Sequence, residues 1–481
     1  MTPNTPPNVL FILIDDMGWR DLSCYGSTFY ESPNIDRLFA EGMHFTDAYA
    51  ACPVCSPTRA SIMTGRYPAR VGVTNYIDWQ KKRHPLRGRV IDAPYIDHLP
   101  RSERSLAAAL KDGGYAAWHV GKWHLGYADS YPEKHGFDVN IGGCEWGMPI
   151  HGHFSPWGLP NLPDENVPEN TYLDDYLTDR AVDLLRNRDP GQPFYLNLSY
   201  YAVHAPVDAK EEDIQYFREK ASRLGLDKAE NVFREGDFHP YERSRDKRVV
   251  HRCIQSNPAF AAMVLNLDRN IGRVLEALSE TGAADDTMIV FTSDNGGLST
   301  SGKAPPTCNA PLAFGKGWVE EGGVREPLIV RWPGVVSAGS VCREPVTSPD
   351  FYPTILEACG RPLEPAQHVD GKSFMPALRG EPFERGPIFW HYPHYSNCGG
   401  HPGCSVRRGA YKLIEFFEDG HLELYDLCND VGETKNLAGE RPAIRDELLA
   451  LLHEWQDDVG AVQMAPNPDW KAYEEGVDPR V

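Results

Sequence analysis

Four groups of polar side chains directly follow apolar runs that are typical of buried strands. They are Asp15 with Asp16, Lys122 with His124, His204 alone, and Asp294 with Asn295. The carboxyl ends of parallel strands meet at one edge of an open α/β sheet, where such folds build their ligand sites. One such group has an ordinary explanation, since an Asp pair is often a turn and a histidine before a proline is often structural. Four groups on four strand ends predict one shared site.

The chemistry of these side chains predicts a hard cation and a bound anion. Three carboxylates and one amide offer oxygen ligands, which favour Ca²⁺, with Mg²⁺ as the less favoured alternative, over zinc. Arg59, Lys122 and Lys316, the last in the segment GKGWVEEGG, are cations that could clamp a tetrahedral anion.

The segment CPVCSPTRASIMTGRYP, residues 52–68, contains a C-x-x-C formed by Cys52 and Cys55. This pattern is common in redox dithiols and in halves of zinc sites. Here, however, a run with helical character follows Cys55 and ends at Gly65. If this run is a helix, its first backbone amides point at whatever Cys55 binds.

The elements that must position these residues alternate between strands and helices. Strands are predicted over 8–16, 115–120, 193–200 and 287–293, and helices over 33–42, 102–114, 172–188 and 256–280. This alternation predicts an α/β fold with a mainly parallel central sheet flanked by helices. The polar stretch 205–250 lacks a strand pattern and is interpreted as a lid-like insertion near the mouth of the site.

The pattern changes after about residue 385. Two strand-like runs within 406–427 are joined at Glu418–Gly420, which is a hairpin signal, and a helix is predicted over 442–456. We therefore expect a catalytic domain over residues 1–385 and a smaller C-terminal subdomain over 386–481 that contains an antiparallel sheet and a helix.

Composition restricts the partners. The 481 residues carry a formal net charge of -20, which argues against a nucleic acid or an anionic membrane surface as partner. No apolar run reaches the ~18 residues of a membrane helix. The cationic run 81–89 is either a solvated loop or a rim contact for an anionic substrate. Of the 11 cysteines, Cys398 and Cys404 could form a disulfide.

The segment CSPTRASIMTGRYP, residues 55–68, closely resembles the signature of type I sulfatases, a family of the alkaline phosphatase superfamily. Further matching segments extend over nearly the whole chain: DDMGWRDLSCYG, PNIDRLFAEG, GKWHLG, HAP, SDNGG, GKGWVEEGGVREPLIVRWPG and LYDLCNDVGETKNLA. In that family the signature cysteine is oxidised after translation to Cα-formylglycine. The resemblance therefore implies an alkaline-phosphatase-like fold, a formylglycine made from Cys55, and Cys52 as a bystander.

The resemblance also implies a role for each site residue. Asp15, Asp16, Asp294, Asn295 and an oxygen of residue 55 would bind Ca²⁺; Arg59 and His124 would orient the formylglycine hydrate; Lys122 and Lys316 would hold the sulfate; and His204 would protonate the leaving alcohol. A formylglycine-generating or anaerobic maturation enzyme is implied as a partner. The resemblance implies a periplasmic or secreted protein whose leader is absent from this chain, although the sequence leaves a cytoplasmic location open.

Aromatic and histidine clusters are the candidates for substrate binding. They are Trp146, His151 and His153 in one segment, and His391 and His394 in another. Sugar rings suit such surfaces, although surface packing explains the clusters equally well. We expect a sulfatase acting at the chain end of a sulfated polysaccharide or glycosaminoglycan fragment. The alternatives are a phosphodiesterase or phosphonate monoester hydrolase of the same superfamily, and a non-catalytic glycan-binding protein. The sequence does not indicate the oligomeric state.

Overall fold

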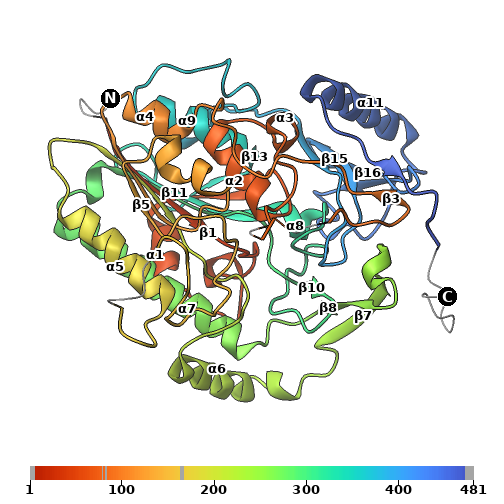
Figure 1. Ribbon diagram of the computed structural model, residues 1–481, viewed down its shortest axis with the longest axis horizontal. Helices are drawn as coiled ribbons and strands as arrows, with labels where there is room; N and C mark the ends of the chain where they lie inside the picture. The colour runs from red at the N-terminus through yellow and green to blue at the C-terminus, as the bar shows by residue number, and fades with distance from the viewer. Residues whose placement is uncertain (1–5, 79, 82–83, 163–166, 472–481) are drawn as a thin grey trace.

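A nine-stranded sheet runs through the centre of the computed structural model, which describes residues 6–78, 80–81, 84–162 and 167–471 (Figure 1). In spatial order its strands are β12 (Ser340–Cys342), β2 (Met43–Tyr49), β11 (Arg325–Arg331), β9 (Thr287–Ser293), β1 (Asn8–Ile14), β6 (Phe194–Ser199), β4 (Ala116–Gly121) and β5 (Val139–Ile141), and β13 (Val346–Thr347) also pairs with β2. All neighbouring pairs are parallel except those of β11, which is antiparallel to both β2 and β9. The predicted α/β class with a mainly parallel sheet is confirmed.

Both faces of this sheet are buried, and β1 shows why its sequence is apolar throughout. Leu10, Ile12 and Ile14 pack into one hydrophobic cluster, and the alternating residues Val9, Phe11 and Leu13 pack into a second cluster on the opposite face. Successive side chains of a strand point to opposite faces, so a strand covered on both sides needs apolar residues at every position.

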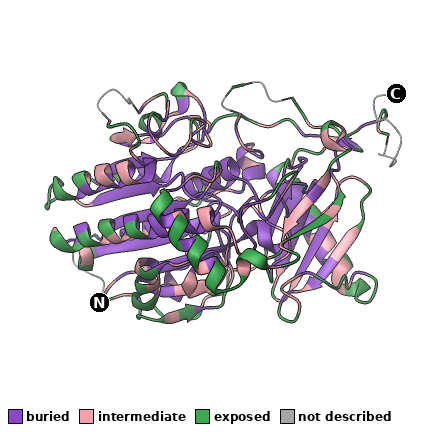
Figure 2. Cartoon of the chain, turned by 90° about the horizontal axis from the view of Figure 1, so that it is seen from below, coloured by how far each residue is buried: buried purple, intermediate pink, exposed green. Residues whose placement is uncertain are grey.

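Helices cover the two faces as separate layers. The first cluster includes residues of α1 (Pro33–Glu41), α5 (Leu173–Arg186), α6 (Glu211–Arg223) and α7 (Pro258–Glu280). The second includes residues of α2 (Cys55–Thr64), α3 (Pro68–Val71), α4 (Leu106–Lys111), α9 (Phe351–Ala358) and α10 (Met375–Leu378). Figure 2 shows the consequence, with buried strands inside and helices whose outer sides are exposed.

A four-stranded antiparallel sheet lies beside the main body. It contains β14 (Ile388–Tyr392), β15 (Gly403–Arg408), β16 (Tyr411–Phe416) and β17 (Leu422–Asp426), and α11 (Pro442–Val459) packs on it. The hairpin predicted at Glu418–Gly420 is the β16–β17 connection. A short pair, β18 (Ala465–Pro466) with β3 (Val90–Ile91), joins the C-terminal segment to the loop after α3.

Several predictions about local structure were wrong. The stretch 205–250 contains α6 and two strands, β7 (Phe233–Phe238) and β8 (Arg248–Arg252), which form a sheet with β10 (Thr300–Ser301). β7 is mostly exposed and β8 is mostly of intermediate burial, and both carry charged residues, so they lack the apolar alternation by which strands are recognised. Helix α4 begins only after its cap Ser105, whose hydroxyl accepts from the amide of Ala108. Cys398 and Cys404 are both free, like all 11 cysteines.

The cationic run 81–89 is only partly described, since residues 82 and 83 lie outside the described residues. Arg89 contacts Asp419 at 3.3 Å, and Arg87 lies 3.3 Å from Asn467 and 4.0 Å from Asp469. Arg89 therefore has a carboxylate partner and Arg87 an amide partner, which favours the solvated loop over the rim contact.

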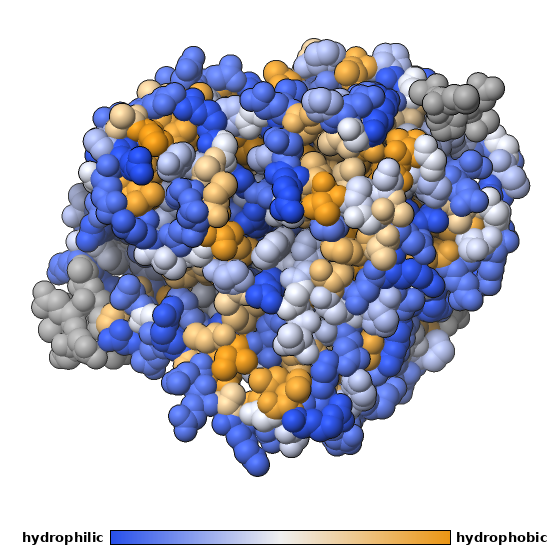
Figure 3. Space-filling view, turned by 180° about the vertical axis from the view of Figure 1, so that it is seen from behind, coloured by the Kyte–Doolittle hydropathy of each residue, from blue (hydrophilic) through white to orange (hydrophobic). Residues whose placement is uncertain are grey.

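The remaining short elements are the turn of helix α8 (Glu321–Val324) and the 3-10 helices η1 (Ser23–Tyr25), η2 (Ala128–Ser130), η3 (Pro132–His135), η4 (Leu226–Lys228), η5 (Glu242–Ser244), η6 (Ala284–Asp286) and η7 (Ser348–Asp350). In the described part of the chain, no helix combines the length and the apolar character that crossing a bilayer requires. The face in Figure 3 is mostly hydrophilic with scattered hydrophobic residues, which agrees with the 24% of charged residues in the sequence.

Candidate active site

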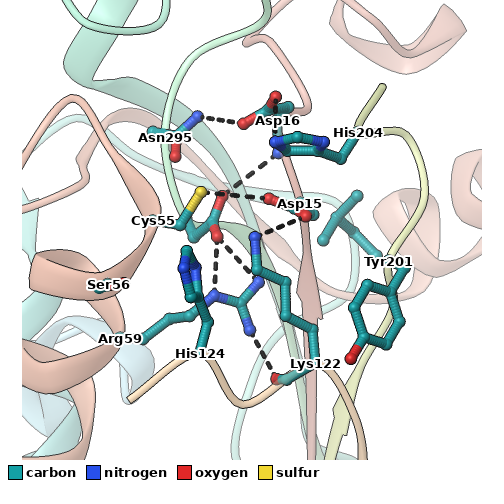
Figure 4. A network of polar contacts seen from close by, with 12 residues as sticks. Asp15, Asp16, Cys55, Ser56, Arg59, Lys122, His124, Tyr201, His204 and Asn295 are labelled. Atoms are coloured by element: carbon teal, nitrogen blue, oxygen red, sulfur yellow. Dashed lines mark hydrogen bonds and ion pairs between the residues drawn. The ribbon is translucent and has the colours of Figure 1, made fainter. Parts of the chain in front are cut away.

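The polar residues that follow four neighbouring or near-neighbouring strands converge at one edge of the main sheet (Figure 4). Asp15 and Asp16 follow β1, Lys122 and His124 follow β4, His204 follows β6, and Asp294 and Asn295 follow β9. Lys316 reaches the same place from the loop before α8. Parallel strand ends explain why residues separated by up to three hundred positions meet here.

Cys55 enters the cluster as the first residue of α2. All ten residues of this helix are buried, and Gly65 ends it with a left-handed φ of 68°. The Sγ of Cys55 lies 3.5 Å from Oδ1 of Asp15. The preceding loop is fixed to the Lys316 loop, because the amide of Gly317 donates to the carbonyl of Pro53 at 2.8 Å.

Each carboxylate of the cluster has a cationic partner, and all of these groups are nearly or fully buried. The pairs are Lys122 with Asp15 at 2.7 Å, Lys316 with Asp16 at 2.7 Å, and Arg59 with Asp294 at 2.8 Å. Arg59 also donates to the carbonyl of Lys122 at 2.8 Å, which ties α2 to the end of β4. Buried charges persist only when paired in this way.

A metal cation fits the oxygen-rich part of the cluster. Ligand atoms of Asp15, Asp16, Cys55 and His204 all lie within 4.8 Å of one another. Asn295 donates from Nδ2 to Asp16 at 2.8 Å, while its buried Oδ1 has no hydrogen-bond partner among the described residues. An orphaned amide oxygen beside carboxylates is a donor set that suits a hard cation.

The pKa shifts of the two aspartates are opposite. Burial raises the pKa of Asp15 to about 8, and Lys122 offsets this only in part. Burial also acts to raise the pKa of Asp16, but the neighbouring His204, Lys316 and Lys122 outweigh it and bring the pKa below its usual range. A cation at this place would favour the ionised form of both carboxyls.

Neither cysteine of the C-x-x-C is activated as a thiol. Burial raises the pKa of Cys55 far above its usual value, more than Lys122 and Lys316 lower it, and burial likewise raises the pKa of Cys52. The thiolate is the reactive form of cysteine, so these protonated thiols do not support a redox dithiol or a zinc site.

His204 is a neutral imidazole in this environment. Its Nδ1 is 2.6 Å from the carbonyl of Ala205, and its Nε2 lies 2.8 Å from Nζ of Lys316. Burial lowers the pKa of His204 to about 3; Asp16 raises it, while Lys316 lowers it further. Nδ1 therefore donates to the carbonyl and Nε2 accepts from the ammonium.

Two residues of the cluster have strained backbones. Asp16 and His124 have φ angles of 58° and 56°, the left-handed region that residues other than glycine rarely adopt. Strain of this kind concentrates at functional sites. The ring of His124 donates from Nε2 to the carbonyl of Ile77 at 2.8 Å, and burial lowers its pKa well below the usual value.

The segment 146–151 lies beside the cluster. A Cβ placed on Gly147 would be 2.5 Å from Cε1 of His124, so the main chain packs directly on that ring. The rings of Trp146 and His151 are 6.3 Å apart, and His151 is exposed. His151 remains a candidate for contact with a substrate, whereas Trp146 is only 8% exposed and belongs to the first hydrophobic cluster.

The structure argues against the three other residues that were predicted to bind substrate, because it buries them. His391 lies between the carbonyl of Val462 and the side chain of Gln456, and His394 contacts the hydroxyl of Thr74 at 2.9 Å. His153 is fully buried and reaches the carbonyl of His204. None of them offers a ring face to a bound sugar, since packing and hydrogen bonds already occupy them.

Sequence analysis missed Asp174, which lies fully buried behind His204. Its position in the first turn of α5 gave it the ordinary explanation of an acidic residue at a helix start. The acidic doublet Asp174–Asp175, separated from His153 by residues 154–173, was the available signal.

Two family models match the chain. The model described as Sulfatase matches residues 7–361, and the model described as N-sulphoglucosamine sulphohydrolase, C-terminal, matches residues 312–458.

Known proteins are similar over most of the chain. A protein named Sulfatase from Formosa agariphila is 32% identical, covering 93% of this chain and 87% of its own length. The N-acetylgalactosamine-6-sulfatase of Homo sapiens is 33% identical, covering 80% of this chain and 68% of its own. The solved structure of Ps i-CgsB in complex with k-i-k-neocarrahexaose is 28% identical, with a TM-score of 0.72, covering 98% of this chain and 95% of its own.

Proposed function

Because the chain belongs to the sulfatase family, and is thereby a sulfuric ester hydrolase with an alkaline-phosphatase-like fold, we propose that it removes sulfate from a sulfated carbohydrate. The nucleophile is a formylglycine derived from Cys55. The observation that carries this proposal is the position of Cys55 at the start of α2, 3.5 Å from Asp15 and among ligand atoms that lie within 4.8 Å of one another.

Ca²⁺ is the cation proposed for the site, held by Asp15, Asp16, Asp294 and Asn295 together with an oxygen of the modified residue 55. The carboxylates and the orphaned Oδ1 of Asn295 support this assignment. When bound, such a cation lowers the pKa of a coordinated hydroxyl and stabilises charge on sulfuryl oxygens.

Formylglycine explains why a cysteine with an unreactive thiol occupies this position. Its hydrate has two hydroxyls on one carbon, so one can attack sulfur and the other can later expel sulfate as the aldehyde forms again. Arg59 and His124 orient the modified residue. Arg59 is held in place for this role, because its guanidinium pairs with Asp294 and donates to the carbonyl of Lys122.

Lys122 and Lys316 hold the sulfate group, as two ammonium groups that face the same carboxylate cluster. Cleavage of the S–O bond leaves charge on the alcohol oxygen, which His204 protonates as general acid, a contribution of ~10²–10⁴-fold. The ring is neutral without substrate. Binding of an anionic ester favours the protonated form of the ring, while the Lys316 ammonium, 2.8 Å away, keeps its proton and its charge for the sulfate.

The proposed substrate class is supported by the relatives and by the segment 146–151 beside the active site. One relative is named for N-acetylgalactosamine 6-sulfate, and one similar structure was solved with a carrageenan oligosaccharide. The exposed ring of His151, in the segment that packs on His124 through Gly147, supplies a polar group of the kind that binds sugars. We further propose action at a chain end, because the insertion 205–250 begins next to His204 and is anchored through β8–β10 just beyond Asn295.

The test is release of sulfate from a panel of sulfated mono- and oligosaccharides that includes N-acetylgalactosamine 6-sulfate and carrageenan oligosaccharides. We expect at least one sugar sulfate to be cleaved with far higher kcat/KM than 4-nitrophenyl sulfate. Efficient turnover only of aryl sulfates, phosphodiesters or phosphonates would overturn the carbohydrate assignment. No turnover, together with an unmodified peptide containing Cys55 after expression with a formylglycine-generating or anaerobic maturation enzyme, would favour a non-catalytic binding protein. A periplasmic or secreted location stays a prediction, which cell fractionation tests.

A further inference from the structure

Two buried side chains, His153 and Asp174, contact the main chain of the segment that carries His204. The Nε2 of His153 donates to the carbonyl oxygen of His204 at 3.2 Å, and one carboxylate oxygen of Asp174 accepts from the amide of Ala202 at 3.3 Å. The His153 ring and the Asp174 carboxylate face each other at 3.5 Å, and neither side chain is exposed. The pair therefore holds both ends of the segment 202–204.

His153 is itself fixed from several directions. Its carbonyl accepts from the amide of Leu173 at 2.8 Å and from the indole of Trp157 at 3.0 Å. Its amide lies 3.3 Å from a carboxylate oxygen of Asp208, and its ring is stacked on Tyr172, with centroids 5.6 Å apart and planes 17° apart. These contacts hold the ring where its Nε2 reaches the carbonyl of His204.

The opposite side of the same segment is attached to the cluster. The amide of Val203 donates to the carbonyl of Asp15 at 2.8 Å, and the amide of Asp15 donates to the carbonyl of Ala202 at 3.1 Å. The segment 202–204 therefore lies between Asp15 on the site side and the His153–Asp174 pair on the far side. The pair therefore contacts this segment on the side opposite to Asp15.

We infer that His153 and Asp174 are positioning residues for His204, which set the place from which its ring protonates the leaving group. This inference rests on the proposed function, in which His204 is the general acid. It assigns a role in the reaction to two residues that never touch the substrate. A small displacement of a catalytic group is costly, since a misplacement of about 1 Å can reduce the rate by about 10²-fold.

The test uses the dependence of rate on the leaving group. A proton donor matters most when the leaving oxygen is strongly basic, so we compare 4-methoxyphenyl sulfate, with a weakly acidic phenol, with 4-nitrophenyl sulfate, with an acidic one. For His153→Ala we expect kcat for the methoxy ester to fall by about 10-fold or more, against at most about threefold for the nitro ester, with KM little changed. A purely structural role would lower both rates in parallel.

Two further variants keep the test decisive if His153→Ala folds poorly. His153→Gln retains an N–H donor and should recover most of the loss on the methoxy ester. Asp174→Asn retains an acceptor for the amide of Ala202 but loses the charge that faces His153, and should show a smaller change of the same kind. His135→Ala is the matched control, because His135 is also buried but contacts Ser130 beside Trp123.

The outcomes separate the two proposals. A selective loss on the methoxy ester, rescued by Gln and absent in the His135 control, supports the positioning role. Equal losses on both esters, or no rescue by Gln while the wild type is active, overturn it and leave the proposed function intact. A wild type that carries formylglycine yet cleaves neither aryl sulfates nor sugar sulfates overturns the proposed function, and the positioning role with it.

Discussion

Lys412 and Glu321 form a fully buried ion pair, with Nζ 3.0 Å from Oε1, that joins the C-terminal sheet to the turn following the Lys316 loop. Nζ is also 3.0 Å from Glu433, whose other carboxylate oxygen accepts from the amide of Glu321 at 2.7 Å. Lys412 of β16 thus fixes the start of α8. The small sheet is therefore part of the framework that supports the active site.

Replacing Lys412 with Met removes the cation that Glu321 and Glu433 share, while Glu321 keeps Arg325 at 3.5 Å. We expect the free energy of unfolding to fall by about 3–5 kcal/mol, because removing one partner of a buried pair leaves an uncompensated charge. Urea denaturation followed by circular dichroism measures this. The control is Lys435→Met, whose pair with Glu440 is exposed and should change stability by less than about 1 kcal/mol. Similar small effects in both variants would contradict the importance of the buried pair.

The buried carboxyl of Glu320 should make the free energy of unfolding depend on pH. Burial raises its pKa from 4.5 to about 8, with a further contribution from Glu433. Between these values the native state keeps a proton that the unfolded state releases, so the free energy of unfolding decreases as the pH rises from about 4.5 to about 8.

Glu320→Gln cannot ionise and should therefore lose less stability between about pH 5 and about pH 8 than the wild type. Urea midpoints at the two pH values measure the difference. Glu381→Gln, at an exposed position, is the control and should follow the wild type. A Glu320→Gln profile parallel to that of the wild type would show that the carboxyl of Glu320 is not the cause.

Replacing Asp294 tests whether the active site binds Ca²⁺. Asp294→Ala removes a proposed ligand and the partner of Arg59, so we expect activity and stoichiometric calcium to be lost together. Elemental analysis and sulfate release measure the two quantities. Asp286→Ala, on the exposed 3-10 helix before β9, should keep both. Stoichiometric zinc in the wild type, with activity retained in Asp294→Ala, would sink the calcium assignment.

Cys55 and Cys52 should respond differently to the same substitution. Cys55→Ser removes the precursor of formylglycine and should lose nearly all activity, whereas Cys52→Ser should keep most of it, because Cys52 is a buried neighbour in a hydrophobic cluster. Sulfate release and the intact mass of the peptide containing residue 55 provide the measurement. The opposite ranking would restore the redox interpretation of the C-x-x-C.

The sequence by itself determined the α/β class and the strand ends at which the polar residues stand. The run 287–293 was predicted as a strand and is β9, and the helix predicted from residue 33 is α1. Such features are local, because a strand covered on both faces must be apolar and a helix needs a start and a stop. The motif from Cys55 to Arg59 is likewise continuous in the chain and identifies the family without any coordinates.

Only the tertiary structure decided which polar side chains face the site and which are enclosed. His151 and His153 are two residues apart, yet one is exposed and the other is fully buried against Tyr172 and Asp174. Arg89 belongs to a cationic run, but Asp419, 330 positions later, neutralises it. Burial and ion pairing depend on segments that are distant in sequence, so neither composition nor spacing contains them. For the same reason, the sequence does not indicate that Asp174 of α5 contacts the segment that carries His204.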